Sequence, residues 1–94
     1  MGKQPLLSDI DIQRQLGALR GWSRRGDAIG KTFTFRGFPE AVAFVERLVA
    51  PAELMNHHPD VDVRYNKVII TLSTHDSGGL TANDLNLAAE IDAL

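Results

Sequence analysis

The fold is decided by the segment Val61-Asp62-Val63-Arg64-Tyr65-Asn66-Lys67-Val68-Ile69-Ile70-Thr71-Leu72. Apolar and charged residues alternate over positions 61–65, and apolar residues recur at positions 68, 70 and 72. Because successive side chains of a strand point to opposite faces, this pattern predicts two strands with a turn at Asn66-Lys67. The segment is therefore expected to form a β-hairpin that buries one apolar face.

A second hairpin is predicted upstream of this segment. Residues 22–25 and 29–35 are two strand-like runs joined through Gly26-Asp27. Phe33 and Phe35 fall on one face of the second run. We expect the two hairpins to join into one four-stranded antiparallel sheet.

Helices are predicted before and between the hairpins. Ser8 can cap a first helix that ends near Gly21, with acidic residues at positions 9 and 11 and apolar residues at 12, 16 and 19. Pro39 is placed as the first residue of a second helix with a broad apolar face. Because proline removes a backbone donor, Pro51 inside this helix predicts a kink, or a break with a restart near Ala50.

A third helix is predicted after a loop at Ser77-Gly78-Gly79. Thr81 and Asp84 match a capping box at its N-terminus. Its apolar positions are Leu85, Ala88, Ala89 and Ile91. The resulting order, α-β-β-α-β-β-α, predicts an α+β fold with three helices packed on one face of a four-stranded antiparallel sheet. Residues 1–94 are expected to form a single domain.

The composition is typical of a small globular enzyme, with 44% hydrophobic and 23% charged residues. The absence of cysteine excludes disulfides, thiolate metal sites and a cysteine nucleophile. No apolar run approaches the ~20 residues of a membrane span, and residues 1–9 lack the apolar stretch of a signal peptide, so a cytoplasmic location is expected. The net charge is -2 and the basic residues are scattered, which argues against direct binding of nucleic acid.

The residues that can carry chemistry follow one spaced pattern, Glu53-x3-His57-His58-Pro59-x5-Tyr65-x9-His75-x8-Asp84. All three histidines of the chain lie within this pattern. Imidazole is the only side chain whose unperturbed pKa lets it both give and take a proton near neutral pH. A 94-residue chain that gathers all its histidines in this way is therefore expected to be an enzyme rather than a scaffold.

The expected secondary structure brings this pattern together. Glu53 and His57 lie four residues apart, so on a continuing helix they share a face and the carboxylate can orient the imidazole. Pro59 then turns the chain into the next strand, which leaves one of the adjacent histidines in a cleft and the other at its rim. His75 follows the end of the last strand, and strand pairing holds it near the start of the preceding strand. Asp84 has two interpretations, a helix cap or a direct role in catalysis.

Five motif elements occur in order along the chain. They are Gly21-Trp22 with Asp27-Ala28-Ile29, Phe33-x-Phe35, Asn56-His57-His58-Pro59-Asp60, Tyr65-Asn66-Lys67-Val68, and Thr71-Leu72-Ser73-Thr74-His75-Asp76-Ser77-Gly78-Gly79-Leu80. In these elements and their spacing the chain resembles the pterin-4a-carbinolamine dehydratases, also described as dimerisation cofactors of a homeodomain transcription factor. The resemblance covers nearly the whole chain and implies the same α+β fold.

The resemblance implies the loss of water from a 4a-hydroxytetrahydropterin to give the quinonoid dihydropterin, in tetrahydrobiopterin recycling and with no cofactor or metal. The catalytic residues are expected to be His57, His58 and His75. Of these, His57 and His75 are expected to serve as acid and base in unresolved order, and His58 chiefly to bind substrate. The implied substrate-binding residues are Asn56, His57, His58, Ser73, Thr74, His75 and Asp76, with Glu53 and Asp84 in support. The resemblance also implies a homodimer or homotetramer.

Two enzymatic alternatives and one binding alternative remain open. Three imidazoles and a water can form a zinc site, although the adjacent His57 and His58 would bind one ion together only with difficulty. A serine hydrolase is disfavoured because no Gly-x-Ser-x-Gly motif is present. The third alternative is a protein-binding dimerisation module without turnover, as the second name of the family suggests.

Overall fold

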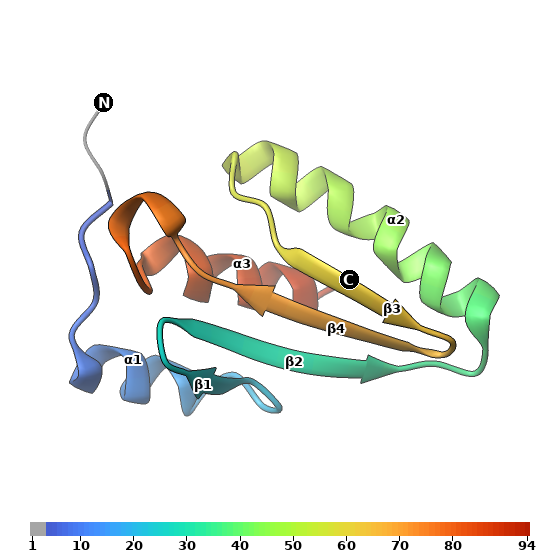
Figure 1. Ribbon diagram of the computed structural model, residues 1–94, viewed down its shortest axis with the longest axis horizontal. Helices are drawn as coiled ribbons and strands as arrows, with labels where there is room; N and C mark the ends of the chain where they lie inside the picture. Colours follow the sequence, from blue (N-terminus) through green and yellow to red (C-terminus); the bar gives the residue numbers. More distant parts are fainter. Residues whose placement is uncertain (1–3) are drawn as a thin grey trace.

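The two predicted hairpins form one antiparallel sheet in the computed structural model, which describes residues 4–94 (Figure 1). Its strands, in the order in which they lie, are β1 (Ser23–Arg25), β2 (Ala28–Thr34), β4 (Lys67–Leu72) and β3 (Asp60–Arg64). Residues 1–3, part of the N-terminal stretch considered for a signal peptide, lie outside the described residues. The predicted four-stranded antiparallel sheet is confirmed.

The turn of the second hairpin lies one residue earlier than predicted. Arg64 pairs with Lys67, so the two turn residues are Tyr65 and Asn66 rather than Asn66 and Lys67. Tyr65 adopts a left-handed backbone conformation with φ 52°. Asn66 is held by Phe35, whose N–H donates to the Asn66 carbonyl at 2.8 Å and whose carbonyl accepts from Asn66 Nδ2 at 3.0 Å. These contacts with another segment set the turn, and the alternation pattern does not contain them.

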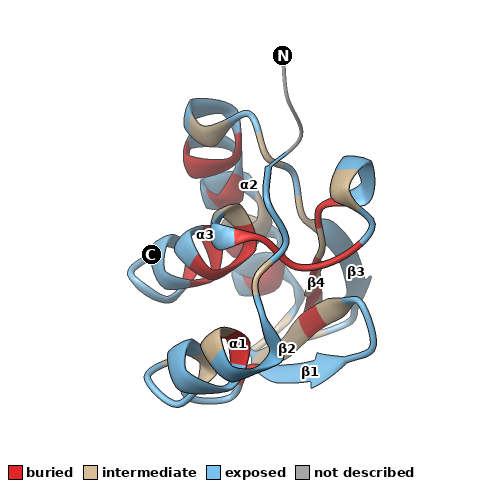
Figure 2. Ribbon diagram, turned by 90° about the vertical axis from the view of Figure 1, so that its left-hand side faces the viewer, coloured by how far each residue is buried: buried red, intermediate tan, exposed pale blue. Residues whose placement is uncertain are grey.

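Three helices cover one face of the sheet, as predicted (Figure 2). They are α1 (Asp9–Leu16), α2 (Phe38–Met55) and α3 (Ala82–Asp92), and a short 3-10 helix, η1 (His75–Ser77), precedes α3. Both predicted N-terminal caps are present, because Ser8 accepts from the Asp11 N–H and Thr81 forms a complete capping box with Asp84. Pro39 is the second residue of α2 rather than its first.

The first helix ends before its predicted limit at Gly21. Leu16 is its last residue, and Gly17 follows as the C-cap. The next residues form tight turns, in which the N–H groups of Ala18 and Leu19 donate to carbonyls three residues back. Glycine is a poor helix former, which explains why the helix stops although the apolar stripe continues. Leu16 and Leu19 still pack against the core from their partly buried positions.

The predicted break in the second helix is wrong, because α2 runs without interruption from Phe38 to Met55 and contains Pro51 in its interior. Pro51 cannot donate to the carbonyl of Arg47. The helix is instead held by its buried face, on which Pro51 itself lies with Leu48 and Ala52. Tertiary packing of this kind outweighs local propensity in most protein helices.

The core lies between the sheet and the helices. Val68, Ile70 and Leu72 of β4 have no exposed surface, which confirms the buried face predicted for this strand. Every residue of β3 is exposed, so the apolar face predicted for positions 61–65 is not buried. On α3 the structure buries Leu87 and leaves the predicted Ala89 exposed. Trp22 anchors one edge, and its Nε1–H donates to the Asp92 carboxylate at 3.0 Å. Within the described part of the chain, none of the helices has the length and apolar character of a membrane span.

Candidate active site

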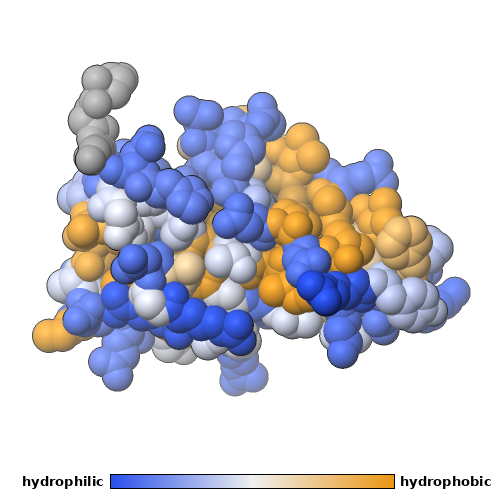
Figure 3. Space-filling model, in the orientation of Figure 1, coloured by the Kyte–Doolittle hydropathy of each residue, from blue (hydrophilic) through white to orange (hydrophobic). Residues whose placement is uncertain are grey.

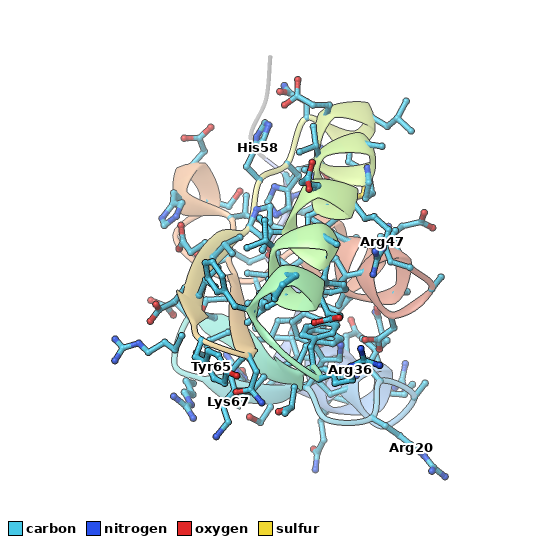
Figure 4. The ribbon with its side chains drawn as sticks, turned by 90° about the vertical axis from the view of Figure 1, so that its right-hand side faces the viewer. Arg20, Arg36, Arg47, His58, Tyr65 and Lys67 are labelled. Atoms are coloured by element: carbon cyan, nitrogen blue, oxygen red, sulfur yellow. The ribbon has the colours of Figure 1, made fainter. Side chains whose placement is uncertain are left out.

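The predicted site residues gather at one end of the sheet. Asp60, the first residue of β3, pairs with Thr71 near the end of β4. The connection from α2 to β3 therefore lies beside the connection from β4 to η1 (Figure 1). Figure 4 shows His58 beside the C-terminal end of α2, far from Tyr65 and Lys67 of the β3–β4 hairpin.

Both connections line one cavity. Its volume is about 230 Å³, and it is lined by Asn56, His57, His58, Ser73, Thr74, His75 and Asp76. These seven residues are the predicted substrate-binding set. They come from two segments separated in sequence, so strand pairing brings the three histidines to one cavity.

The end of α2 determines how the first two histidines are presented. Asn56 is the C-cap of the helix in a left-handed conformation, with φ 50° and ψ 44°. Asparagine is one of the few residues that adopt this conformation readily. The chain therefore leaves the helical path before His57, whose N–H still donates to the Ala52 carbonyl at 3.0 Å.

The predicted pairing of Glu53 with His57 is wrong. Glu53 Oε2 instead lies 2.6 Å from His58 Nε2. The helical four-residue spacing does not apply because the left-handed Asn56 lies between the two positions. The Glu53–His58 pair is exposed, with 68% and 56% of the respective side chains accessible, so it contributes little to stability.

His57 contacts Asp84 instead. His57 Nε2 and Asp84 Oδ1 are 2.6 Å apart, and the two side chains are 11% and 0% exposed. The Asp84 side chain also caps α3, because Oδ2 accepts the Thr81 N–H at 2.9 Å. Asp84 thus both caps α3 and contacts a site histidine.

His75 reaches the cavity from a loop. It is the first residue of η1 and is exposed to solvent. The loop is closed by hydrogen bonds in both directions between Thr74 and Gly79, at 2.9 and 3.3 Å. Gly78 allows this turn with a positive φ of 77°. A firmly closed loop thus presents a solvent-exposed imidazole at the cavity.

Residues 5–94 match the family model described as "Pterin 4 alpha carbinolamine dehydratase". The chain belongs to this family. Two relatives with the curated name "Putative pterin-4-alpha-carbinolamine dehydratase" illustrate the similarity. The protein of Roseiflexus castenholzii is 52% identical over 89 residues, covering 95% of this chain and 96% of the relative. The protein of Sulfurisphaera tokodaii is 49% identical over 88 residues, covering 94% and 95%.

Two solved structures share the fold of this pterin-4a-carbinolamine dehydratase family member. A "transcriptional coactivator/pterin dehydratase" from Brucella melitensis gives a TM-score of 0.90 at 33% identity, over 95% of this chain and 97% of that one. A "pterin dehydratase-like protein" described as "a RuBisCO assembly factor in the alpha-carboxysome" gives 0.61 at 26% identity, over 77% and 83%. The fold therefore occurs in proteins described as dehydratase and as assembly factor.

One residue of the site in this family member was missed by the sequence interpretation, which gave Thr81 only a capping role. Thr81 is fully buried, and its Oγ1 lies 2.7 Å from Thr74 Oγ1. Thr74 Oγ1 in turn donates to Asp84 Oδ2 at 2.8 Å. The Thr74 hydroxyl, predicted to hydrogen-bond the substrate, is therefore committed to Asp84. The capping box between Thr81 and Asp84, three positions apart, was the one signal for this network in the sequence.

The arrangement of these side chains bears on the zinc alternative. Among residues 4–94, no group of three or more histidine, cysteine, aspartate or glutamate side chains is arranged to bind a metal ion. The two adjacent histidines instead contact different carboxylates, His57 that of Asp84 and His58 that of Glu53.

Proposed function

We propose that this chain removes water from a 4a-hydroxytetrahydropterin to give the quinonoid dihydropterin, as a step of tetrahydrobiopterin recycling. The observation that carries the proposal is the cavity in which His57, backed by the buried Asp84, meets His58 and His75. Membership of the pterin-4a-carbinolamine dehydratase family supplies the substrate class.

The reaction requires two proton transfers. The bond between C4a and the hydroxyl oxygen breaks, and this oxygen must gain a proton to leave as water. The ring nitrogen beside C4a loses its proton as the double bond to C4a forms. The two transfers balance, so one general acid and one general base suffice, with no external oxidant or reductant.

The three histidines have environments suited to different roles. His57 is nearly buried and oriented by Asp84, whereas His75 is held on the rim by its closed loop. These two imidazoles would exchange the two protons, and the order of acid and base stays open. His58, more than half exposed, would chiefly contact the substrate.

The remaining cavity residues would bind the pterin ring. Ser73 and Asp76 come from the segment that carries His75, and Asn56 comes from the end of α2. Backbone and side-chain groups at these positions can hydrogen-bond the amide-like edge of a pterin. Asn56 is neutral, so its contact with the pterin would lack the charge assistance that a carboxylate gives.

Stopped-flow ultraviolet absorbance of 4a-hydroxytetrahydropterin decay tests the proposal. Wild type should accelerate decay over buffer, and His57→Ala and His75→Ala should each lose about 100-fold or more of that acceleration, as expected for a general acid or base. Arg20→Ala, an exposed position outside the cavity, is the matched control and should retain wild-type turnover. Equal rates for wild type and both histidine variants would contradict the proposal.

The alternative function is a binding module without turnover. It is favoured by one observation, the fold shared with a protein described as a RuBisCO assembly factor. The two functions differ in their dependence on the loop histidine. A binding module should keep its partner affinity in His75→Ala, whereas the dehydratase should lose most of its turnover.

The chain is also proposed to form a homodimer or homotetramer in the cytoplasm. Apolar surface gathers over α2 and β3 in Figure 3. A groove of about 200 Å³ lies there, lined in part by Val49, Leu48 and Val61. Val49 is 60% exposed and Leu54 on the same helix is 87% exposed. A second copy that covers this surface would enlarge the small apolar core of a 94-residue chain.

A further inference from the structure

Two buried hydroxyl groups lie behind the Asp84 carboxylate. Thr74 is 8% exposed and Thr81 is not exposed at all. The Thr81 Oγ1 accepts the Asn83 N–H at 3.3 Å and lies 2.7 Å from Thr74 Oγ1. Thr74 Oγ1 contacts Asp84 Oδ2 at 2.8 Å, and Asp84 Oδ1 contacts His57 Nε2 at 2.6 Å. These contacts form one continuous hydrogen-bond network from the first turn of α3 to the cavity.

The direction of each hydrogen bond in this network follows from the number of protons that each group can donate. An ionised carboxylate only accepts, so Thr74 must use its single hydroxyl proton on Asp84. Thr74 can then only accept from Thr81, whose hydroxyl proton is therefore committed to Thr74. On its other oxygen, Asp84 accepts from His57, so His57 Nε2 carries a proton and, in the neutral imidazole, the lone pair lies on Nδ1.

We infer that Thr81 is a positioning residue, which acts through Thr74 and Asp84 to hold His57 in the tautomer protonated at Nε2. The inference rests on the proposed function, because it is Nδ1 of this tautomer that would exchange a proton with the substrate. In hydrolases, a buried carboxylate holds a catalytic imidazole in the required tautomer in the same way.

A purely structural role for Thr81 makes a different prediction. A cap needs only an oxygen that accepts the Asn83 N–H, and it makes no use of the Thr81 hydroxyl proton. The structure commits that proton to Thr74, and among residues 4–94 no buried side-chain nitrogen or oxygen lacks a hydrogen-bond partner. Removing the proton would leave Thr74 free to rotate away from Asp84.

Four variants separate the two roles. Thr81→Val and Thr74→Val remove one hydroxyl each at nearly constant shape, and Thr81→Ser keeps the hydroxyl as a rescue. Ser8→Ala is the matched control, because Ser8 caps α1 by accepting the Asp11 N–H at 3.1 Å and lies outside the cavity. Each variant is compared by kcat, by KM and by the nitrogen-15 chemical shifts of the His57 imidazole, assigned with His57→Ala.

The positioning role predicts that both valine variants lower kcat about 10-fold to 100-fold, the loss expected from a misplaced catalytic group, with KM little changed. Their His57 shifts should move from the Nε2–H tautomer toward a mixture, while Thr81→Ser and Ser8→Ala stay at wild type. A Thr81→Val protein whose kcat and imidazole shifts match Ser8→Ala would overturn the inference.

The imidazole shifts also separate this inference from the proposed function. They are read without substrate, so a tautomer change in Thr81→Val supports the positioning contact even in a protein that shows no turnover. A wild-type protein with the His57 proton on Nδ1 overturns the inference, whatever its dehydratase activity.

Discussion

At the scale of the residue, Asp84 joins two roles that the sequence could only offer as alternatives. Its oxygens accept from Thr74, from the Thr81 backbone and from His57, and the side chain has no exposed surface. The capping box could be predicted from the sequence because its two residues lie only three positions apart. The contact with His57 spans 27 positions and depends on how α3 packs beside the end of α2, which no local pattern contains.

Asp84→Asn should reverse the tautomer of His57. The new amide can donate where the carboxylate accepts, so Nε2 would become the acceptor and the proton would move to Nδ1. We expect kcat for dehydration to fall by about 100-fold to 10,000-fold, by analogy with the same substitution in a catalytic triad. Stopped-flow turnover measures the loss, and a thermal unfolding curve shows whether the variant is folded. Wild-type turnover in a folded Asp84→Asn protein would contradict the role of the pair.

Glu53→Gln should have a much smaller effect. The Glu53–His58 contact is short, at 2.6 Å, but both side chains are more than half exposed, so solvent weakens the interaction. We expect kcat/KM to stay within about threefold of wild type. The same turnover assay measures this ratio. A loss of activity as large as that of Asp84→Asn would show that the Glu53–His58 pair belongs to the catalytic machinery.

At the scale of the element, the sequence predicted what is local and missed what is set by tertiary contacts. The alternation around Val68 and the caps at Ser8 and Thr81 gave the correct hairpin face and helix starts. The continuity of α2 through Pro51 could not be predicted, because the buried face of the helix holds it together. The predicted pairing of His57 with Glu53 was wrong for a related reason, because the orientation of His57 depends on the left-handed conformation of Asn56.

Pro51→Ala tests how α2 tolerates its proline. Alanine would restore the hydrogen bond to the Arg47 carbonyl, and the change of propensity favours the helix by about 3 kcal/mol. The loss of two buried methylene groups opposes this by about 0.8 kcal/mol each. The net stabilisation of about 1.4 kcal/mol would raise Tm by about 6–11 °C for a chain of this size. Circular dichroism melting measures the shift, and a lower Tm would show that the ring packing dominates.

At the scale of the whole molecule, the fold and the site were predicted from different features of the sequence. The order of elements follows from apolar periodicity and turns, and the similar structure from Brucella melitensis shares the fold at a TM-score of 0.90. The seven cavity residues were selected from the family resemblance, and strand pairing places them together. The Thr74–Thr81 network was not predicted, because hydroxyl groups in a strand end and a cap carry no distinctive pattern.

The assembly proposed for the whole molecule makes a prediction at Val49. This residue is 60% exposed on the apolar groove over α2 and β3. Val49→Asp would place a charge in the proposed interface at little cost to the monomer, so it should shift the assembly to monomer in multi-angle light scattering. Ala50→Asp, an exposed position on the same helix but outside the groove lining, is the control for one added negative charge. A wild-type protein that is monomeric at micromolar concentration would contradict the assembly.

The most direct test of the central claim is the decay of 4a-hydroxytetrahydropterin in the presence of the wild-type chain. The proposed function predicts decay faster than in buffer, with a rate that saturates as substrate rises and with quinonoid dihydropterin as the product. Decay no faster than in buffer would contradict it and favour a family member that binds without turnover.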